Sequence, residues 1–228
     1  MFPINDTEPN RYSPFPVMTV FLIVANALIL FQEFFWMRAD PFFINRYGST
    51  PAFILARFGP GAVTAITSMF LHADIFHLFS NMLALWVFGR RVEDACGSVR
   101  FLFFYLLCGV AANILSTIVR AGAPIPGIGA SGAVFGVMGA YLILYPGGRI
   151  RTLIFVWGPV IAWPRIRAFW VVLYFFALQI IPAIDILLSK AEYYIGYWAH
   201  LGGFFASITI LLFLRPEAFA RYMSDVEV

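Results

Sequence analysis

Repeated apolar runs of about twenty residues constrain this chain more than any other feature of its sequence. A helix needs about 20 consecutive apolar residues to cross the hydrocarbon core of a bilayer. Of the 228 residues, 61% are hydrophobic and 12% are charged, a charged share about half that of soluble domains. The sequence therefore predicts an all-α polytopic membrane protein, a bundle of six transmembrane helices. The candidate spans are residues 16–36, 64–88, 99–119, 130–145, 168–188 and 195–214.

The fourth predicted span is short for a membrane helix. At a rise of 1.5 Å per residue, residues 130–145 make a helix of about 24 Å. We expect its N-terminal end to lie below the membrane surface, in a recess lined by protein or water. A further apolar run, residues 153–163, is too short to span and contains Gly158-Pro159. We interpret that run as interfacial or re-entrant.

The distribution of Lys and Arg indicates how the chain is oriented. Six spans leave both termini on one side, whose segments hold ten of the fifteen basic residues. The positive-inside rule makes that side cytoplasmic, and this orientation accounts for the pI near 9.0 without a nucleic-acid partner. The predicted regions are a cytoplasmic tail at 1–15, expected to be disordered, a membrane domain at 16–214 and a second cytoplasmic tail at 215–228.

Polar side chains occur in three of the predicted spans, where they are costly and usually functional. Ser131 lies between glycines at the start of span four, and His200 lies about one turn into span six. His77 and Asn81, four residues apart, share a face of span two. The three spans run in the same direction. We therefore expect all four residues to converge in the outer half of the membrane.

Small residues predict which of these spans touch. Spans four and six each carry a small residue at every fourth position, a pattern that lets helices approach closely. We expect the two spans to pack through these stripes, which would place Ser131 near His200. The stripes are Gly132, Gly136 and Ala140 in span four, and Ala199, Gly203 and Ser207 in span six.

This set of side chains fits nucleophilic catalysis. A neighbouring histidine can activate a serine hydroxyl, and the tetrahedral intermediate needs donors placed where the oxyanion forms. We interpret Ser131 as the nucleophile and His200 as the general base. The Ser131 backbone N–H, the Asn81 amide and a His77 ring N–H are the candidate oxyanion donors, and Gly129 would let a substrate backbone come close. No acidic residue is placed to complete a triad, so a Ser–His dyad is predicted.

Other interpretations stay open for several residues. Ser131 could be only the N-cap of its helix. His72 would either bind substrate or water near the mouth of the site, or hydrogen-bond the loop. Phe135, one turn below Ser131, would offer a ring face to His200. Glu93 is interpreted as tying down loop backbone and Gln179 as a helix-packing group. Neither a cofactor nor a metal site is predicted, because the HExxH pattern is absent.

Three motifs together resemble the rhomboid family of intramembrane serine proteases. The resemblance covers residues 16–214, although the first external loop lacks the Trp-Arg pair that many members carry. It implies a buried Ser–His dyad reached by water, with Ser131 as nucleophile, His200 as base, and His77 and Asn81 as oxyanion donors. The motifs are Gly129-Ala-Ser131-Gly132 followed by Phe135, the series His72…His77…Asn81, and Ala199-His200-Leu-Gly-Gly203.

The predicted function is an intramembrane serine endopeptidase of the bacterial inner membrane. Its expected partners are the lipid bilayer and membrane proteins with unstable transmembrane segments, because an intact helix shields its peptide bonds. One alternative is a catalytically inactive relative that binds transmembrane helices, which the presence of both Ser131 and His200 disfavours. A small-solute transporter is the other alternative, disfavoured by the lack of internal repeats. We expect span five, or the loop before span six, to act as the gate for substrate.

Overall fold

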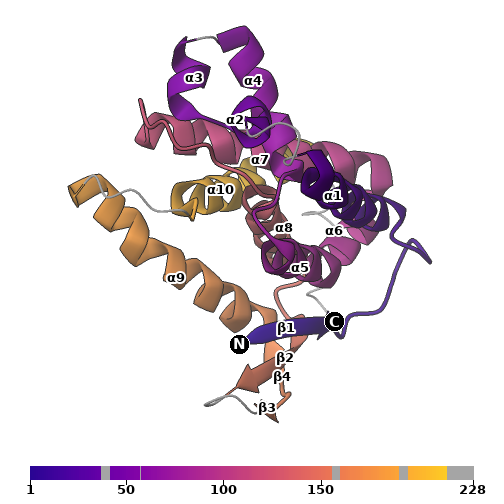
Figure 1. Ribbon diagram of the computed structural model, residues 1–228. Coiled ribbons are helices and arrows are strands. Elements are labelled where there is room, and N and C mark those ends of the chain that lie inside the picture. The colour runs from indigo at the N-terminus through magenta and orange to yellow at the C-terminus, as the bar shows by residue number, and fades with distance from the viewer. Residues whose placement is uncertain (37–41, 57, 156–159, 190–194, 215–228) are drawn as a thin grey trace.

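Helices make up most of the structure (Figure 1). The computed structural model describes residues 1–36, 42–56, 58–155, 160–189 and 195–214. Among the described residues, four helices are long and apolar enough to cross a membrane, at the positions predicted for spans one, three, five and six. This confirms a multi-pass helical membrane protein. The four are α1 (Val17–Trp36), α7 (Ser98–Val119), α9 (Ala168–Ser189) and α10 (Tyr197–Leu214).

The second predicted span, residues 64–88, is wrong as a single straight helix. Two helical segments, 61–70 and 75–96, take its place with a bend of 86° between them. The second segment begins at Ile75 because the Asp74 carboxylate caps it, accepting the His77 N–H at 2.8 Å. Hydropathy does not reveal this break, since both sides of it are apolar. The elements are α4 (Phe58–Thr67), η1 (Ser68–Phe70), α5 (Ile75–Ala84), the π-helical η2 (Leu85–Gly89) and α6 (Arg90–Cys96).

The short fourth span is α8 (Ser131–Leu144). Its 14 residues make a helix of about 21 Å, and most of them are buried between α7 and α10. Glycines allow this close packing. A Cβ on Gly136 would lie 2.6 Å from the Cys108 Cβ of α7, and a Cβ on Gly203 of α10 would overlap the Gly132 carbonyl oxygen. The predicted packing of spans four and six through their stripes is confirmed.

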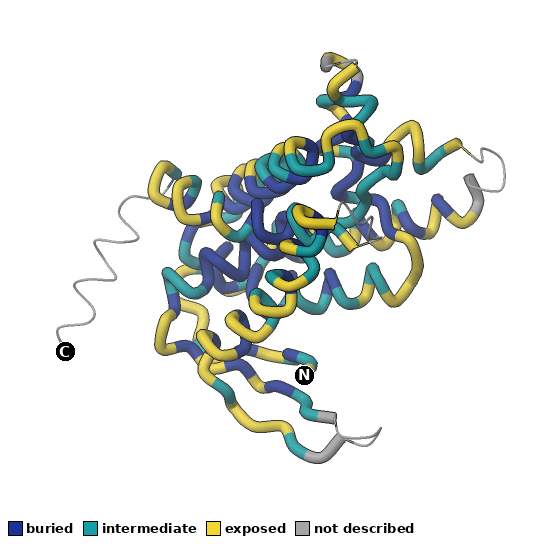
Figure 2. Tube along the Cα trace, turned by 90° about the vertical axis from the view of Figure 1, so that its left-hand side faces the viewer, coloured by how far each residue is buried: buried dark blue, intermediate teal, exposed yellow. Residues whose placement is uncertain are grey.

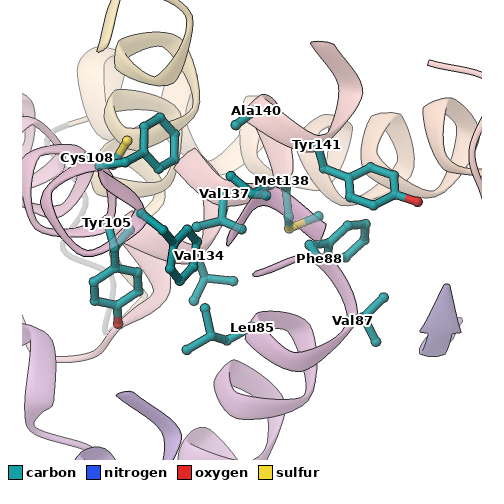
Figure 3. Packing of buried hydrophobic residues seen from close by; sticks show 14 of the residues in the cluster. Leu85, Val87, Phe88, Tyr105, Cys108, Val134, Val137, Met138, Ala140 and Tyr141 are labelled. Atoms are coloured by element: carbon teal, nitrogen blue, oxygen red, sulfur yellow. The ribbon is translucent and has the colours of Figure 1, made fainter. Parts of the chain in front are cut away.

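The hydrophobic core surrounds α8 where it meets α7 and the π-helical segment η2 (Figure 3). Val134 and Val137 of α8 and Leu85 of η2 belong to this core, and none is more than 2% exposed. Phe88 meets Tyr141 edge to face, with the ring centroids 5.3 Å apart. Because this core encloses α8, the first residue of the helix is held in a fixed place.

A small antiparallel sheet lies at the end of the bundle where α8 ends and α9 begins (Figures 1 and 2). Its central strand β2 (Arg149–Phe155) pairs with β1 (Phe2–Asp6), β3 (Val160–Ala162) and β4 (Arg165–Arg167). One expectation is wrong here, because the N-terminal residues are not disordered and β1 is a paired strand. The described residues of the run 153–163 contribute to strands β2 and β3, whereas residues 156–159 lie outside the described part of the chain. An interfacial or re-entrant position of this run stays a prediction. Strand β1 lies far from its partner β2 in the sequence, so apolar runs alone do not reveal this pairing.

Buried acids attach the N-terminal residues to the bundle. Asp6, at 2% exposure, forms an ion pair with the Arg91 Nε at 2.8 Å. Glu93 is 1% exposed and accepts the backbone N–H groups of Met18 at 2.8 Å and Thr19 at 2.7 Å. These two N–H groups belong to the first turn of α1, which has no partner for them within the helix. The contacts agree with the interpretation of Glu93 as a residue that holds backbone.

Two short helices, α2 (Phe43–Tyr47) and α3 (Pro51–Ala56), follow α1 in the chain. Between them, Ser49 exchanges backbone hydrogen bonds of 2.9 and 2.8 Å with Gly127. Gly127 lies in the segment that leads into α8. The segment that follows α1 is therefore joined to the chain just before Ser131.

Candidate active site

Ser131 is the first residue of α8, and its side chain does not cap the helix. Ala130 occupies the N-cap position and makes no side-chain hydrogen bond there. The Ser131 hydroxyl instead faces His200 of α10, with 2.7 Å between Oγ and Nε2. The N-cap interpretation therefore does not hold, and the predicted proximity of Ser131 and His200 is confirmed.

The His200 ring is held by two neighbours besides Ser131. It stacks on Phe135, with centroids 4.5 Å apart and planes 7° from parallel, as the sequence predicted. Its Nδ1 lies 2.8 Å from the Oε1 of Gln179 on α9. The Gln179 amide nitrogen donates to the Phe175 carbonyl oxygen at 2.8 Å. A carbonyl oxygen only accepts, so the amide nitrogen must face Phe175 and the amide oxygen must face His200.

Gln179 therefore determines which nitrogen of His200 carries the proton. The amide oxygen accepts, so the proton of the neutral ring lies on Nδ1, and the lone pair of Nε2 faces the Ser131 hydroxyl. Gln179 and His200 are 7% and 8% exposed, so water does not readily replace this contact. The interpretation of Gln179 as a helix-packing group missed this contact with His200. One signal was available, because a polar side chain within a membrane span usually has a specific partner.

His77 and Asn81 approach Ser131 from α5. The His77 Nδ1 accepts the Ala73 backbone N–H at 3.3 Å, which places the ring proton on Nε2. The Asn81 amide donates one N–H to the His77 carbonyl oxygen at 3.1 Å, and a primary amide has a second N–H. Both residues line one cleft together with Ser131 and His200. These four residues therefore converge on one cleft as predicted, and their place in the outer half of the membrane stays a prediction.

Gly129 has a backbone conformation that only glycine adopts readily. Its φ is +119°, in a region that side chains with a Cβ rarely occupy. A Cβ there would stand 2.8 Å from the His77 Nε2 and 3.8 Å from the Ser131 Oγ. In this structure the His77 ring occupies the space that a Cβ on Gly129 would take. The approach of a substrate backbone to Gly129 stays a prediction. The His77 Nε2 and the Ser131 Oγ thus both lie within 4 Å of the position that a Gly129 Cβ would take.

A cleft of about 540 Å³ opens from these polar groups into the apolar interior. Its walls come from α5, α8 and α9, and it also reaches Phe2 of β1. Along α8 it follows Ser131, Phe135 and Met138, which lie on one face of the helix over about 10 Å. The cleft therefore offers a largely apolar surface that runs along α8 and includes the Ser131 hydroxyl.

A second, smaller cavity of about 50 Å³ lies on the other side of Ser131. Polar groups are prominent in its lining, which includes the side chains of Ser68, Asn113, Ser116 and Thr117. A water molecule needs a polar cavity with about 10–15 Å³ of space for its centre. This cavity therefore has room for a few water molecules next to Ser131.

His72 lies outside the cleft. It is 1% exposed, in the turn between η1 and α5, and its ring centroid is 5.0 Å from that of His77. Neither ring nitrogen has a hydrogen-bond partner among the described residues. The two interpretations of His72, a substrate or water contact near the mouth and a hydrogen bond to the loop, stay open. Within the described part of the chain, no three His, Cys, Asp or Glu side chains form a metal-sized cluster.

Comparison with known proteins gives a consistent result. The family model of the Rhomboid domain matches residues 60–217. The chain is 47% identical over 91 residues to Rhomboid protease GluP of Bacillus subtilis, covering 39% of this chain and 17% of that protein. It is 35% identical over 97 residues to Rhomboid protein 1, mitochondrial, of Saccharomyces cerevisiae, covering 41% of this chain and 28% of that protein. It is 28% identical over 250 residues to RHOMBOID-like protein 1 of Arabidopsis thaliana, covering 89% of this chain and 55% of that protein. The matched part is thus about half or less of each relative's length.

Proposed function

Because the chain belongs to the rhomboid family, we propose that it is an intramembrane serine endopeptidase. It hydrolyses peptide bonds in or near transmembrane segments of other membrane proteins. The observation that carries this proposal is the 2.7 Å contact between the Ser131 Oγ and the His200 Nε2 in a largely apolar cleft. A nucleophile within hydrogen-bond reach of an oriented base is the arrangement that acyl transfer needs.

The reaction proceeds through an acyl-enzyme. The Ser131 Oγ attacks the carbonyl carbon of the substrate while its proton passes to the His200 Nε2. The C–N bond then breaks, and the imidazolium returns that proton to the leaving amine. A water molecule next attacks the ester carbon while His200 accepts its proton. The C–O bond to Ser131 then breaks, the imidazolium returns the proton to the Ser131 Oγ, and the acid product leaves. The small polar cavity beside Ser131 supports a supply of water for this second half.

Three donors stabilise the oxyanion of each tetrahedral intermediate. The Ser131 backbone N–H lies in the first turn of α8, where N–H groups have no partner within the helix. The His77 Nε2–H is oriented by the Ala73 contact, and the second N–H of Asn81 lies on the same wall of the cleft. In subtilisin, removing one such donor reduces kcat by about 10²–10³-fold. His77 and Asn81 therefore contribute to rate more than to substrate affinity.

Substrate segments reach Ser131 through the cleft between α5, α8 and α9. A peptide bond within an intact helix has its carbonyl oxygen hydrogen-bonded, so the segment has to unwind before Ser131 can attack. We therefore expect substrates whose transmembrane segments contain helix-breaking or small residues near the cut. The test is a series of substrates in which that stretch is stabilised as helix by alanine. Cleavage should slow along the series, and an unchanged rate would contradict this account of selectivity.

We further propose that the end of the bundle where α8 begins faces away from the cytoplasm. The sheet and both chain termini then lie on the cytoplasmic side of a bacterial inner membrane. The excess of Lys and Arg in the segments of that side supports this orientation. Cleavage would accordingly take place in the outer half of the bilayer.

Labelling with a fluorophosphonate probe tests the nucleophile without knowledge of the natural substrate. The probe phosphonylates an activated serine, so wild-type protein in vesicles should be labelled, whereas Ser131→Ala and His200→Ala should not. Ser189→Ala, at the end of α9, serves as the control and should label like the wild type. Equal labelling of Ser131→Ala and the wild type would overturn the proposal.

A further inference from the structure

Four arginines share one face of the strand pair β2–β4. Arg149 stands opposite Arg167 and Arg151 opposite Arg165 in the antiparallel register. Side chains alternate between the two faces of a strand, so all four project on the same face, and all four are exposed. Between them, Ile150 is 0% exposed and faces the bundle. We call these four residues the arginine face.

Among the described residues, no side chain neutralises this face. No ion pair or hydrogen bond joins any of the four side chains to another residue that the structure describes. Nearby Arg90 and Arg91 differ, because both form ion pairs with Asp6. Directly opposed residues have Cβ atoms about 5 Å apart, and like charges in that position destabilise a strand pair. Two such pairs side by side fit a surface that is completed by an anion from outside the chain.

The position of the arginine face indicates which anion is available. Arg167 is followed at once by Ala168, the first residue of the membrane helix α9. The three residues of β4 extend about 10 Å, comparable to the depth of the headgroup layer. Trp163 and Trp170, 65% and 58% exposed, flank β4 in the sequence, and tryptophan concentrates at membrane interfaces. The arginine face therefore lies at the depth of lipid headgroups.

We propose that the arginine face binds the phosphates of anionic phospholipids in the leaflet next to the sheet. Guanidinium groups bind phosphate through paired N–H donors, so each cross-strand pair can bracket one phosphate. The two pairs are about 7 Å apart along the strands, which permits two neighbouring headgroups to bind together. Bound lipid then attaches the sheet to the membrane at the base of α9. This proposal does not depend on the chemistry of Ser131.

Lipid retention measures this binding directly. The full-length protein is reconstituted in vesicles of phosphatidylcholine and phosphatidylglycerol at a 3:1 ratio, extracted in mild detergent, and its bound phospholipids are quantified. The wild type should retain phosphatidylglycerol at several-fold above its share in the vesicles. In the variant with all four arginines changed to glutamine, retention should fall to the vesicle ratio. The corresponding four-lysine variant keeps the charge and should retain part of the enrichment.

Two further measurements separate lipid binding from a fold defect. In pure phosphatidylcholine, the four-glutamine variant should melt at or above the wild-type Tm, because repulsion between the arginines is removed. Added phosphatidylglycerol should raise the Tm of the wild type but not that of the variant.

Arg46→Gln, on α2 at the other end of the bundle, is the location control. If the four-glutamine variant does not fold, Arg151→Gln/Arg165→Gln replaces it. Equal enrichment in wild type and variant, or no enrichment in the wild type, would overturn the proposal.

Discussion

At the scale of single residues, the site depends on which nitrogen of His200 holds the proton. Ser131 and His200 could be selected from motifs in the sequence, because each is a polar residue in a costly place next to small residues. Gln179 could not be assigned in the same way. Its partner is His200, on a different helix, and only the way α9 packs against α10 brings the two together. Such a contact depends on tertiary structure and leaves no local pattern.

Changing Gln179 tests its role as a positioning residue. Gln179→Leu removes the acceptor for the His200 Nδ1 proton while keeping a similar volume. We expect kcat to fall about tenfold with little change in KM, since a neutral hydrogen bond contributes about 1–1.5 kcal/mol and 1.36 kcal/mol is tenfold in rate. Gln179→Glu restores an acceptor at the same place and should recover most of the lost rate. If both variants lose the same activity, the residue has only a packing role.

At the scale of elements, glycine-mediated contact between α8 and α10 sets the distance from Ser131 to His200. The stripes of small residues predicted this pairing correctly, because close packing requires them wherever they occur. The bend before α5 was not predicted, although it presents His77 and Asn81 to the cleft. Its cause is the Asp74 cap in a stretch that is apolar on both sides. A hydropathy window averages over such a cap.

Gly203→Ala tests the contact between α8 and α10. The new Cβ would overlap the Gly132 carbonyl oxygen, so the helices must separate, and separation lengthens the Ser131–His200 hydrogen bond. We expect a loss of about 1–3 kcal/mol in stability, measured as a lower Tm, and a larger proportional loss of activity. Gly147→Ala is the control, because no atom lies within 4 Å of the added Cβ. Similar Tm values for the two variants would contradict this packing account.

At the scale of the whole molecule, hydropathy gave the membrane class and most span positions, but not the sheet. The strands of that sheet are not contiguous in the sequence, since β1 lies at Phe2–Asp6 and the other three strands lie within residues 149–167. The Arg-Ile-Arg repeats of β2 and β4 have the alternation typical of strands. Only the strand register shows that the four arginines of these repeats share one face.

Thiol accessibility tests the proposed orientation of the whole molecule. The described native cysteines, Cys96 and Cys108, are buried, so an introduced cysteine gives a clear signal. In intact cells, a membrane-impermeant maleimide should label Arg46→Cys on α2 and not Ser13→Cys near the N-terminus. After the membrane is permeabilised, both should be labelled. The reverse pattern in intact cells would show that the bundle is inverted.

Cleavage of a membrane substrate in vesicles tests the central claim most directly. A test substrate with a helix-destabilised transmembrane segment is reconstituted with wild-type protein, Ser131→Ala or His200→Ala, and the products are identified by mass spectrometry. Hydrolysis by Ser131 predicts cuts within or next to that segment by the wild type alone, with both variants folded and inactive. Cleavage by Ser131→Ala at the wild-type rate would contradict the account.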